Sequence, residues 1–182
     1  QVTPLGPPVS FTVQALGTPS LPPADRAALL AFERQTARLQ RAVLGAVESA
    51  KEAQTRLDHL KKALADAPAA DPQLAGEARA LESRLKDLRE DLSGDAVKAA
   101  KNEPVPPGIV ERVQTIVAGH WSSTSAPTAT ARQNYEVAAA KFEGVLAKLR
   151  TLIEVDLKRL DDRAEAAGAP WTPGRVPVWT RE

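Results

Sequence analysis

The residues that could carry out chemistry are few in this chain of 182 residues. Neither of its two histidines, His59 and His120, has a Glu three residues before it, the spacing that holds a di-iron site in a helical bundle. There is no cysteine, which excludes thiolate metal sites, cysteine nucleophiles and disulfides. The hydroxyl run at residues 122–125 lacks the Gly-x-Ser-x-Gly elbow of a hydrolase. We assign His59 no role, and we predict a protein that is not an enzyme and has no metal site or cofactor.

His120 and Trp121 have two interpretations. They stand at the end of a predicted helix and directly before the hydroxyl run, where they are placed to contact a small ligand or a partner. We favour the alternative, in which the imidazole caps the helix end and the indole covers the tip of the bundle.

Asp156 also has two interpretations. It lies seven residues after Leu149, on the apolar stripe of the last predicted helix, as a buried acid awaiting a partner or ligand would. We favour the alternative, in which Leu157 takes the buried place and Asp156 is solvated, because unpaired carboxylates are almost never fully buried.

These side chains are positioned by helices whose limits are set by proline. Proline removes a backbone donor and clashes with the preceding helical turn, so long helices fit only in the proline-free stretches. Apolar residues repeat there with a spacing of three and four, giving a seven-residue period. Asp71 and Pro72 are typical of a helix start, and Gly94 and Gly168 of helix ends. We predict helices at about residues 24–67, 72–93, 107–120 and 128–167.

The predicted fold class is all-α, an elongated antiparallel bundle of three to four helices over residues 24–168. Two long helices, the first and the last, flank two shorter ones. The shorter helices lie either side by side or end to end. We slightly favour the end-to-end arrangement, because their summed length approaches that of each long helix.

The two ends of the chain differ in kind from the helical middle. Residues 1–23 form an extended arm in which Val9, Phe11 and Val13 alternate with polar residues, so a strand is predicted at residues 9–14. A single strand is not stable alone, and this one completes a sheet upstream or pairs with a partner. Residues 169–182 form an extended tail, and its Trp171 and Trp179 predict docking onto another surface.

Composition excludes several function classes. A net charge of +1 gives no basic excess for nucleic-acid binding, and there is no run of about 18 apolar residues for membrane insertion. The chain begins with Gln1 and shows no signal-peptide pattern, which predicts a piece processed from something longer.

The layout resembles the C-terminal helical region of bacterial extracytoplasmic proteins with sortilin-like (Vps10-type) or BNR β-propeller repeats. The resemblance covers nearly the whole chain. It rests on the segments at residues 9–13, 21–32, 102–104, 123–128 and 168–174. It implies an exported parent, located in the periplasm or outside the cell, with this chain as its terminal module. The propeller and its Asp-box repeat are missing here, so no propeller activity is carried over.

The sequence therefore favours a non-catalytic structural or docking module. It would be an accessory subunit that binds a protein partner in a larger extracytoplasmic assembly. The exposed part of a membrane-embedded complex is one such assembly. The candidate contact residues are Val9, Phe11, Val13, His120, Trp121, Trp171 and Trp179. Two alternatives stay open, namely a homo-oligomer that associates through the seven-residue seams, and the C-terminal part of a propeller-type hydrolase whose active site lies elsewhere.

Overall fold

The computed structural model describes residues 6–13, 21–67, 71–177 and 179–181, and within them all regular secondary structure is helical. The all-α prediction is thus confirmed. The elements are α1 (Pro23–Ala65), α2 (Pro72–Ser93), the short α3 (Ala96–Ala100), α4 (Ile109–Ser122), α5 (Ala129–Arg150), the π-helical segment η1 (Thr151–Leu157) and α6 (Lys158–Ala166).

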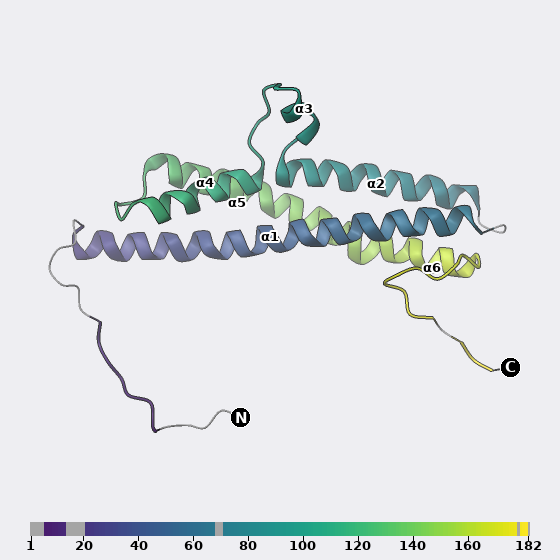
Figure 1. Cartoon of the computed structure of the whole chain (residues 1–182), viewed down its shortest axis with the longest axis horizontal. Helices are drawn as coiled ribbons and strands as arrows, with labels where there is room; N and C mark the ends of the chain where they lie inside the picture. Colours follow the sequence, from purple (N-terminus) through teal and green to yellow (C-terminus); the bar gives the residue numbers. More distant parts are fainter. Residues whose placement is uncertain (1–5, 14–20, 68–70, 178, 182) are drawn as a thin grey trace.

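The helices form a long rod of three parallel rows (Figure 1). One row is α1, whose 43 residues make it about 65 Å long. The second is the continuous helix formed by α5, η1 and α6. The third consists of α2 and α4, which lie end to end and contact both other rows. The two middle helices therefore extend one another instead of packing side by side.

The core is the apolar stripe of α1 and the stripes that cover it. The buried residues of α1 follow the three-and-four spacing seen in the sequence. Leu29, which continues this spacing toward the start of the helix, is half-buried. Thr36 is fully buried, and its hydroxyl donates to the Phe32 carbonyl oxygen at 2.9 Å. The remaining buried residues of α1 are Phe32, Leu39, Val43, Ala46, Ala50, Ala53, Leu57, Leu60, Ala63 and Leu64.

Local signals explain where the helices begin and end. The Asp71 carboxylate accepts from the Gln73 amide at 2.8 Å, and Pro72 occupies the first helical position. The Thr128 hydroxyl accepts from the Ala131 amide at 3.1 Å at the start of α5. Gly94 and Gly168 have φ values of 84° and 73°, which glycine adopts without strain.

The π-helical segment η1 corrects the register of the last row. The buried apolar residues of the row formed by α5, η1 and α6 are Ala138, Phe142, Val145, Leu149, Leu152, Leu157, Leu160 and Ala164. Their spacing is three or four everywhere except from Leu152 to Leu157, which is five. The wider π turn absorbs this extra residue, so Leu157 still faces the core. Leu146 and Ile153 also fit the apolar spacing of the sequence, but both are half-buried, and Val145 and Leu152 take the buried face instead.

Residues 95–107, which include α3, project from the rod between α2 and α4 (Figure 1). The segment leaves the rod at Gly94 and rejoins it at Gly108, and these two glycines are in close contact. A Cβ added to Gly108 would lie 2.7 Å from the Gly94 nitrogen and 2.8 Å from the Ser93 carbonyl carbon. This close approach allows α4 to start beside the point where α2 ends.

One ion pair ties α1 to α2 near the outer end of the rod. Lys61 Nζ lies 2.8 Å from each carboxylate oxygen of Glu82, and Gln54 adds a further hydrogen bond. The hydrogen bond from Lys61 is the main reason why the pKa of Glu82 is lowered from its ordinary value of 4.5. Both side chains remain about one third exposed to solvent, which screens the pair, so it contributes little to the free energy of unfolding.

Residues 6–13 form no strand among themselves or with the rest of the described chain. Val9, Phe11 and Val13 are strongly exposed, with Phe11 84% accessible. Gln14, the last residue of the predicted strand, lies outside the described residues. The strand at residues 9–14 stays a prediction that requires a partner sheet.

We predict that Gly108→Ala destabilises the protein by about 1–3 kcal/mol, because the new methyl group overlaps the backbone at the end of α2. The matched control is Gly144→Ala. Gly144 lies on the exposed side of α5 with nothing within 4 Å of an added Cβ, so this change should stabilise the protein by about 0.5–1 kcal/mol. Urea unfolding followed by circular dichroism measures both. Equal effects of the two substitutions would contradict the close contact of the two glycines.

We also predict that deleting Val155 leaves stability within about 1 kcal/mol of the full chain. Val155 is 54% exposed, and its removal brings Leu152 and Leu157 to the four-residue spacing of an α-helix. Deleting Glu143 is the control, because it rotates one half of the buried face away from the core and should cost about 3 kcal/mol or more. Thermal and urea unfolding of both variants measure the two losses of stability. If deleting Val155 costs more than deleting Glu143, η1 does not maintain the register of the buried residues.

Candidate functional site

The predicted contact residues fall into two groups at different places along the rod. His120 and Trp121 lie at the end of α4, beside the N-terminal part of α1, which the arm carrying Phe11 precedes. Trp171 and Trp179 belong to the tail, which follows α6. Leu29 and Arg56 mark the two places on α1, and their separation along the helix is about 40 Å.

The first part of the tail is attached to the rod through Arg175. Its guanidinium lies over the Trp171 ring at 5.1 Å and donates to the Asp161 and Pro170 carbonyl oxygens. Gly174 sits against the side chain of Arg56 on α1. The described residues after Gly168 contain no helix or strand, but the Arg175 amide donates to the Thr172 carbonyl oxygen at 3.1 Å and closes a turn within the tail that was predicted to be extended.

The outer part of the tail is not covered. Trp179 is 80% exposed, and Val176 is similarly accessible, whereas Trp171 is covered over more than half of its surface. Within the described tail, the Trp171 ring is therefore partly covered, with the Arg175 guanidinium over it, and Trp179 is presented to solvent.

An ion pair beneath the tail joins α1 to α6. Arg56 Nη2 donates to Asp161 Oδ2 at 2.6 Å, and Asp161 is 9% exposed. The sequence pattern gave no role to Asp161, since it belongs to an acidic stretch at the end of a helix. The available signal was its place next to Leu160, on the edge of the buried face.

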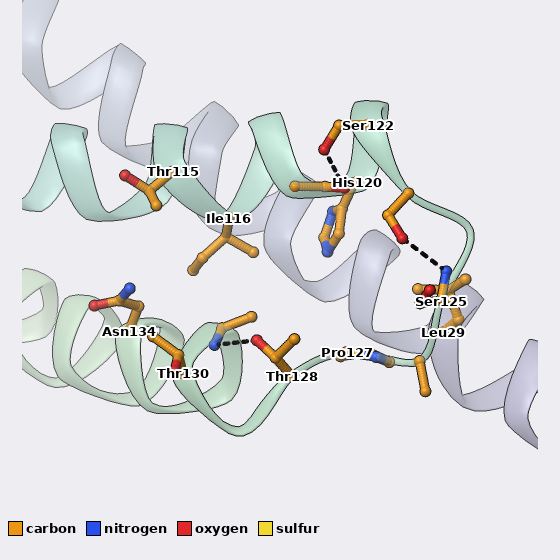
Figure 2. Close-up of a pocket in the computed structure, with 14 residues that line it drawn as sticks. Leu29, Thr115, Ile116, His120, Ser122, Ser125, Pro127, Thr128, Thr130 and Asn134 are labelled. Atoms are coloured by element: carbon orange, nitrogen blue, oxygen red, sulfur yellow. Dashed lines mark hydrogen bonds between the residues drawn. The ribbon is translucent and has the colours of Figure 1, made fainter.

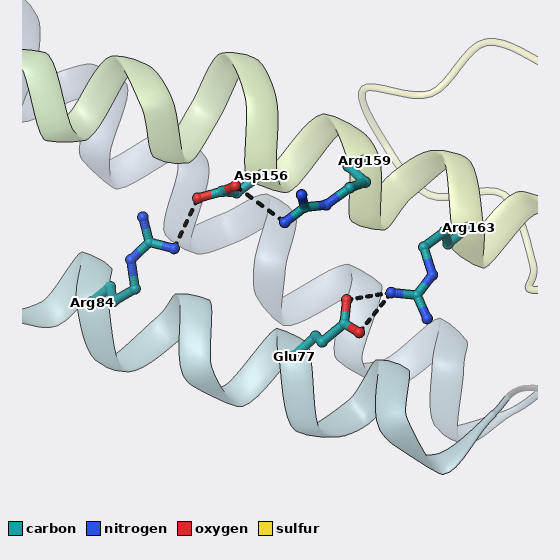
Figure 3. A network of polar contacts seen from close by, with 5 residues as sticks. All are labelled: Glu77, Arg84, Asp156, Arg159 and Arg163. Atoms are coloured by element: carbon teal, nitrogen blue, oxygen red, sulfur yellow. Dashed lines mark hydrogen bonds and ion pairs between the residues drawn. The ribbon is translucent and has the colours of Figure 1, made fainter.

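A second polar network joins α2 to the last row, and Figure 3 shows its five residues. Asp156 accepts from Arg84 at 2.8 Å and from Arg159 at 3.2 Å. Arg163 Nη1 donates to both oxygens of Glu77 at 2.6 Å. Asp156 is therefore neither a buried acid awaiting a ligand nor solvated, because it is paired across the helices.

Leu157 is fully buried, so the prediction that it takes the buried place on the apolar stripe in preference to Asp156 is correct. Asp156 is turned toward α2, where Arg84 reaches it from a helix that lies 72 residues away in the chain. A pairing at that separation is not visible in the sequence pattern of either helix.

A pocket of about 230 Å³ lies at the other end of the rod, where α4 passes into α5. Its walls come from Leu29 of α1, the last turns of α4, the connecting turn and the first turns of α5 (Figure 2). The lining combines small apolar residues with hydroxyl groups, one amide and His120. No Asp, Glu, Lys or Arg is among the described residues that line it.

His120 lies in the last turn of α4, as a cap would, but its side chain does more than end the helix. The imidazole packs edge-on against Phe32 of α1, with ring centroids 5.4 Å apart. Its Nε2 atom is buried and has no hydrogen-bond partner. Trp121 is 88% exposed, so the indole does not cover the end of the bundle as we had favoured.

Two other site classes find no support in the described part of the chain. No three His, Cys, Asp or Glu side chains there are grouped as a metal ion requires. None of the helices that the structure describes is long and apolar enough to cross a bilayer.

Comparisons of the chain with protein-family models, with curated proteins and with solved structures find no match.

We predict that Asp161→Ala lowers the free energy of unfolding by about 1–2 kcal/mol, because it leaves the half-buried Arg56 without its partner. The neighbouring Asp162→Ala is the control. Asp162 pairs with Lys158 within one helix and is well exposed, so its loss should cost no more than about 0.5 kcal/mol. Urea titrations of the two variants under the same conditions measure the difference. An equally small cost at both positions would mean that the Arg56 pair does not stabilise the rod.

Proposed function

We propose that this chain is a non-catalytic docking module, an accessory subunit that binds a larger extracytoplasmic protein assembly. One observation carries the proposal. The rod buries its own apolar stripes, yet large apolar side chains outside it stay uncovered at both ends of the chain, at Val9, Phe11, Val13, Val176 and Trp179. Clustered exposed apolar groups on a soluble chain are typical of interaction sites.

The N-terminal arm is suited to strand addition. In an extended chain, Val9, Phe11 and Val13 lie on the same side, and the backbone amides and carbonyls of this segment have no partners among the described residues. An edge strand of a partner sheet would supply hydrogen bonds to the backbone and an apolar surface for these three side chains.

The tail is suited to aromatic anchoring. Arg175 fastens the chain to α6 four residues before Trp179, which limits the freedom that the indole would lose on binding. Tryptophan is among the residues that contribute most to binding energy at protein interfaces. We also include Trp121 in the proposed contact surface, since it is the most exposed large apolar residue described at the other end of the rod.

The cellular setting of the proposal comes from the resemblance to the C-terminal region of sortilin-like and BNR-repeat proteins. On this resemblance we propose that the module lies in the periplasm or outside the cell, as part of an exported protein. Self-association through the seven-residue seams is less favourable, because Leu57, Leu60 and Leu85 of those seams are already fully buried by the helices of the same chain.

Site-specific photo-crosslinking in cells of the source organism tests the proposal. A crosslinker at position 11 or 179 should give an adduct with one defined partner. The control is position 97, which is also exposed and lies on α3. The same adduct from all three positions, or adducts only between copies of this chain, would overturn the proposal.

With the partner in hand, we predict that Phe11→Ser combined with Trp179→Ser weakens its binding at least about tenfold, as loss of buried aromatic anchors does. Val97→Ser should leave the affinity unchanged. Both variants should keep the helical circular dichroism signal, because neither side chain is part of the core. Isothermal titration or surface plasmon resonance gives the affinities, and equal binding by the two variants would contradict the role of the arms.

A further inference from the structure

The segment that projects between α2 and α4 has no part in the proposed docking of the arms (Figure 1). Its second half carries three prolines, Pro104, Pro106 and Pro107. We propose that residues 103–107 form a polyproline II helix that a partner protein binds in a groove lined by aromatic side chains.

Proline fixes the backbone of residues 103–107. The pyrrolidine ring holds φ of each proline at about −65°. The residue before a proline is restricted to the extended or polyproline II region, and this applies to Glu103, Val105 and Pro106. The structure has no helix or strand over residues 103–107, and Gly108 continues the run with φ −66° and ψ 170°. These dihedral angles are close to those of polyproline II.

The run is also held at both ends. The Glu103 amide donates to the Lys98 carbonyl oxygen at 3.1 Å, and the Asn102 amide donates to the Ala99 carbonyl oxygen at 3.0 Å. With Asn102 at φ 57°, these two bonds form the Schellman motif that ends α3. At its other end the run rejoins the rod at the contact between the two glycines. Binding a segment that is already restrained in this way costs little conformational entropy.

The run presents its prolines to solvent. A polyproline II helix has three residues per turn, so its side chains lie along separate edges. Val105 is half-buried, as is Pro107 where the run meets the rod, whereas Pro104 and Pro106 are exposed. No hydrogen bond joins residues 104–107 to the rest of the described chain. The edges that carry Pro104 and Pro106 are therefore open to a partner.

The packing of the rod does not explain these prolines. No residue from 95 to 107 is among the buried apolar residues of the core. The alignment of α2 with α4 is set at Gly94 and Gly108, before and after the projecting segment. The prolines therefore shape a surface feature and not the core.

The chemistry of the run selects the kind of partner. Rigid apolar rings on a preformed polyproline II helix fit grooves lined by aromatic side chains. Pairing with a partner strand is less suitable, because proline lacks the N–H group that a sheet requires. The flanking Lys101 and Glu103 have opposite charges, so the run has no net charge to attract nucleic acid or a charged membrane surface.

Site-specific photo-crosslinking tests the inference with the full chain in cells of the source organism. A crosslinker at position 106 should give an adduct with one protein, and mass spectrometry should locate the crosslink in a groove lined by Trp or Tyr side chains. The inference is overturned by no adduct, by an adduct with a second copy of this chain, or by a crosslink to a surface without aromatic side chains. Positions 11 and 179 report on the arms, so failure of their docking is distinguished from failure here.

The affinity of the purified full chain for that protein gives a second test. Pro104→Ala combined with Pro106→Ala should weaken binding about tenfold, because it frees the backbone and removes two rings. The control is Val97→Ala, which removes exposed apolar surface from the same segment but leaves the polyproline II run intact, and it should change the affinity less than about twofold. Both variants should keep the helical circular dichroism signal.

Two results of the titrations would overturn the inference. If Val97→Ala weakens binding as much as the double proline variant, the contact surface is α3 and not the polyproline II run. If the double proline variant binds as tightly as the unchanged chain, the prolines are not recognised.

Discussion

The buried stripe of α1 is the surface on which the whole rod depends. Helices α2, α4, α5 and α6 all contact α1, and its buried residues extend from Phe32 to Leu64. Leu57 and Leu60 are completely buried in the half covered by α2, whereas the middle of the stripe consists of the small residues Ala46, Ala50 and Ala53. Because every other long helix is aligned to one straight template, the rod has a single axis and its two ends are held at a fixed separation.

The features that follow from short-range forces were predictable from the sequence. Prolines, the Asp71 cap and the three-and-four spacing of apolar residues each act within one or two helical turns, so they located the helices and most of the core. Features that depend on contact with a second helix were not predictable from the sequence. The step from Leu152 to Leu157 follows from matching a neighbouring row, and the partner of Asp156 comes from α2.

The candidate sites divide in the same way. Phe11 and Trp179 were found from the sequence because large apolar residues stand out in proline-rich, extended segments. The pocket was not, because Leu29 comes to lie beside residues of α4 and α5 only when the rod is assembled. His120 attracted attention as a lone histidine at a helix end, but its contact with Phe32 and its unpaired nitrogen depend on that same assembly.

The contact between Gly94 and Gly108 separates the rod from the segment that projects between its two halves. Because residues 95–107 leave and return at nearly one point, their length does not alter the alignment of α2 with α4. In evolutionary terms this is a permissive position, where a longer loop or a complete inserted domain can be gained or lost while the rod keeps its geometry. The same property makes it the natural place to carry a fluorescent or affinity label without disturbing either end of the molecule.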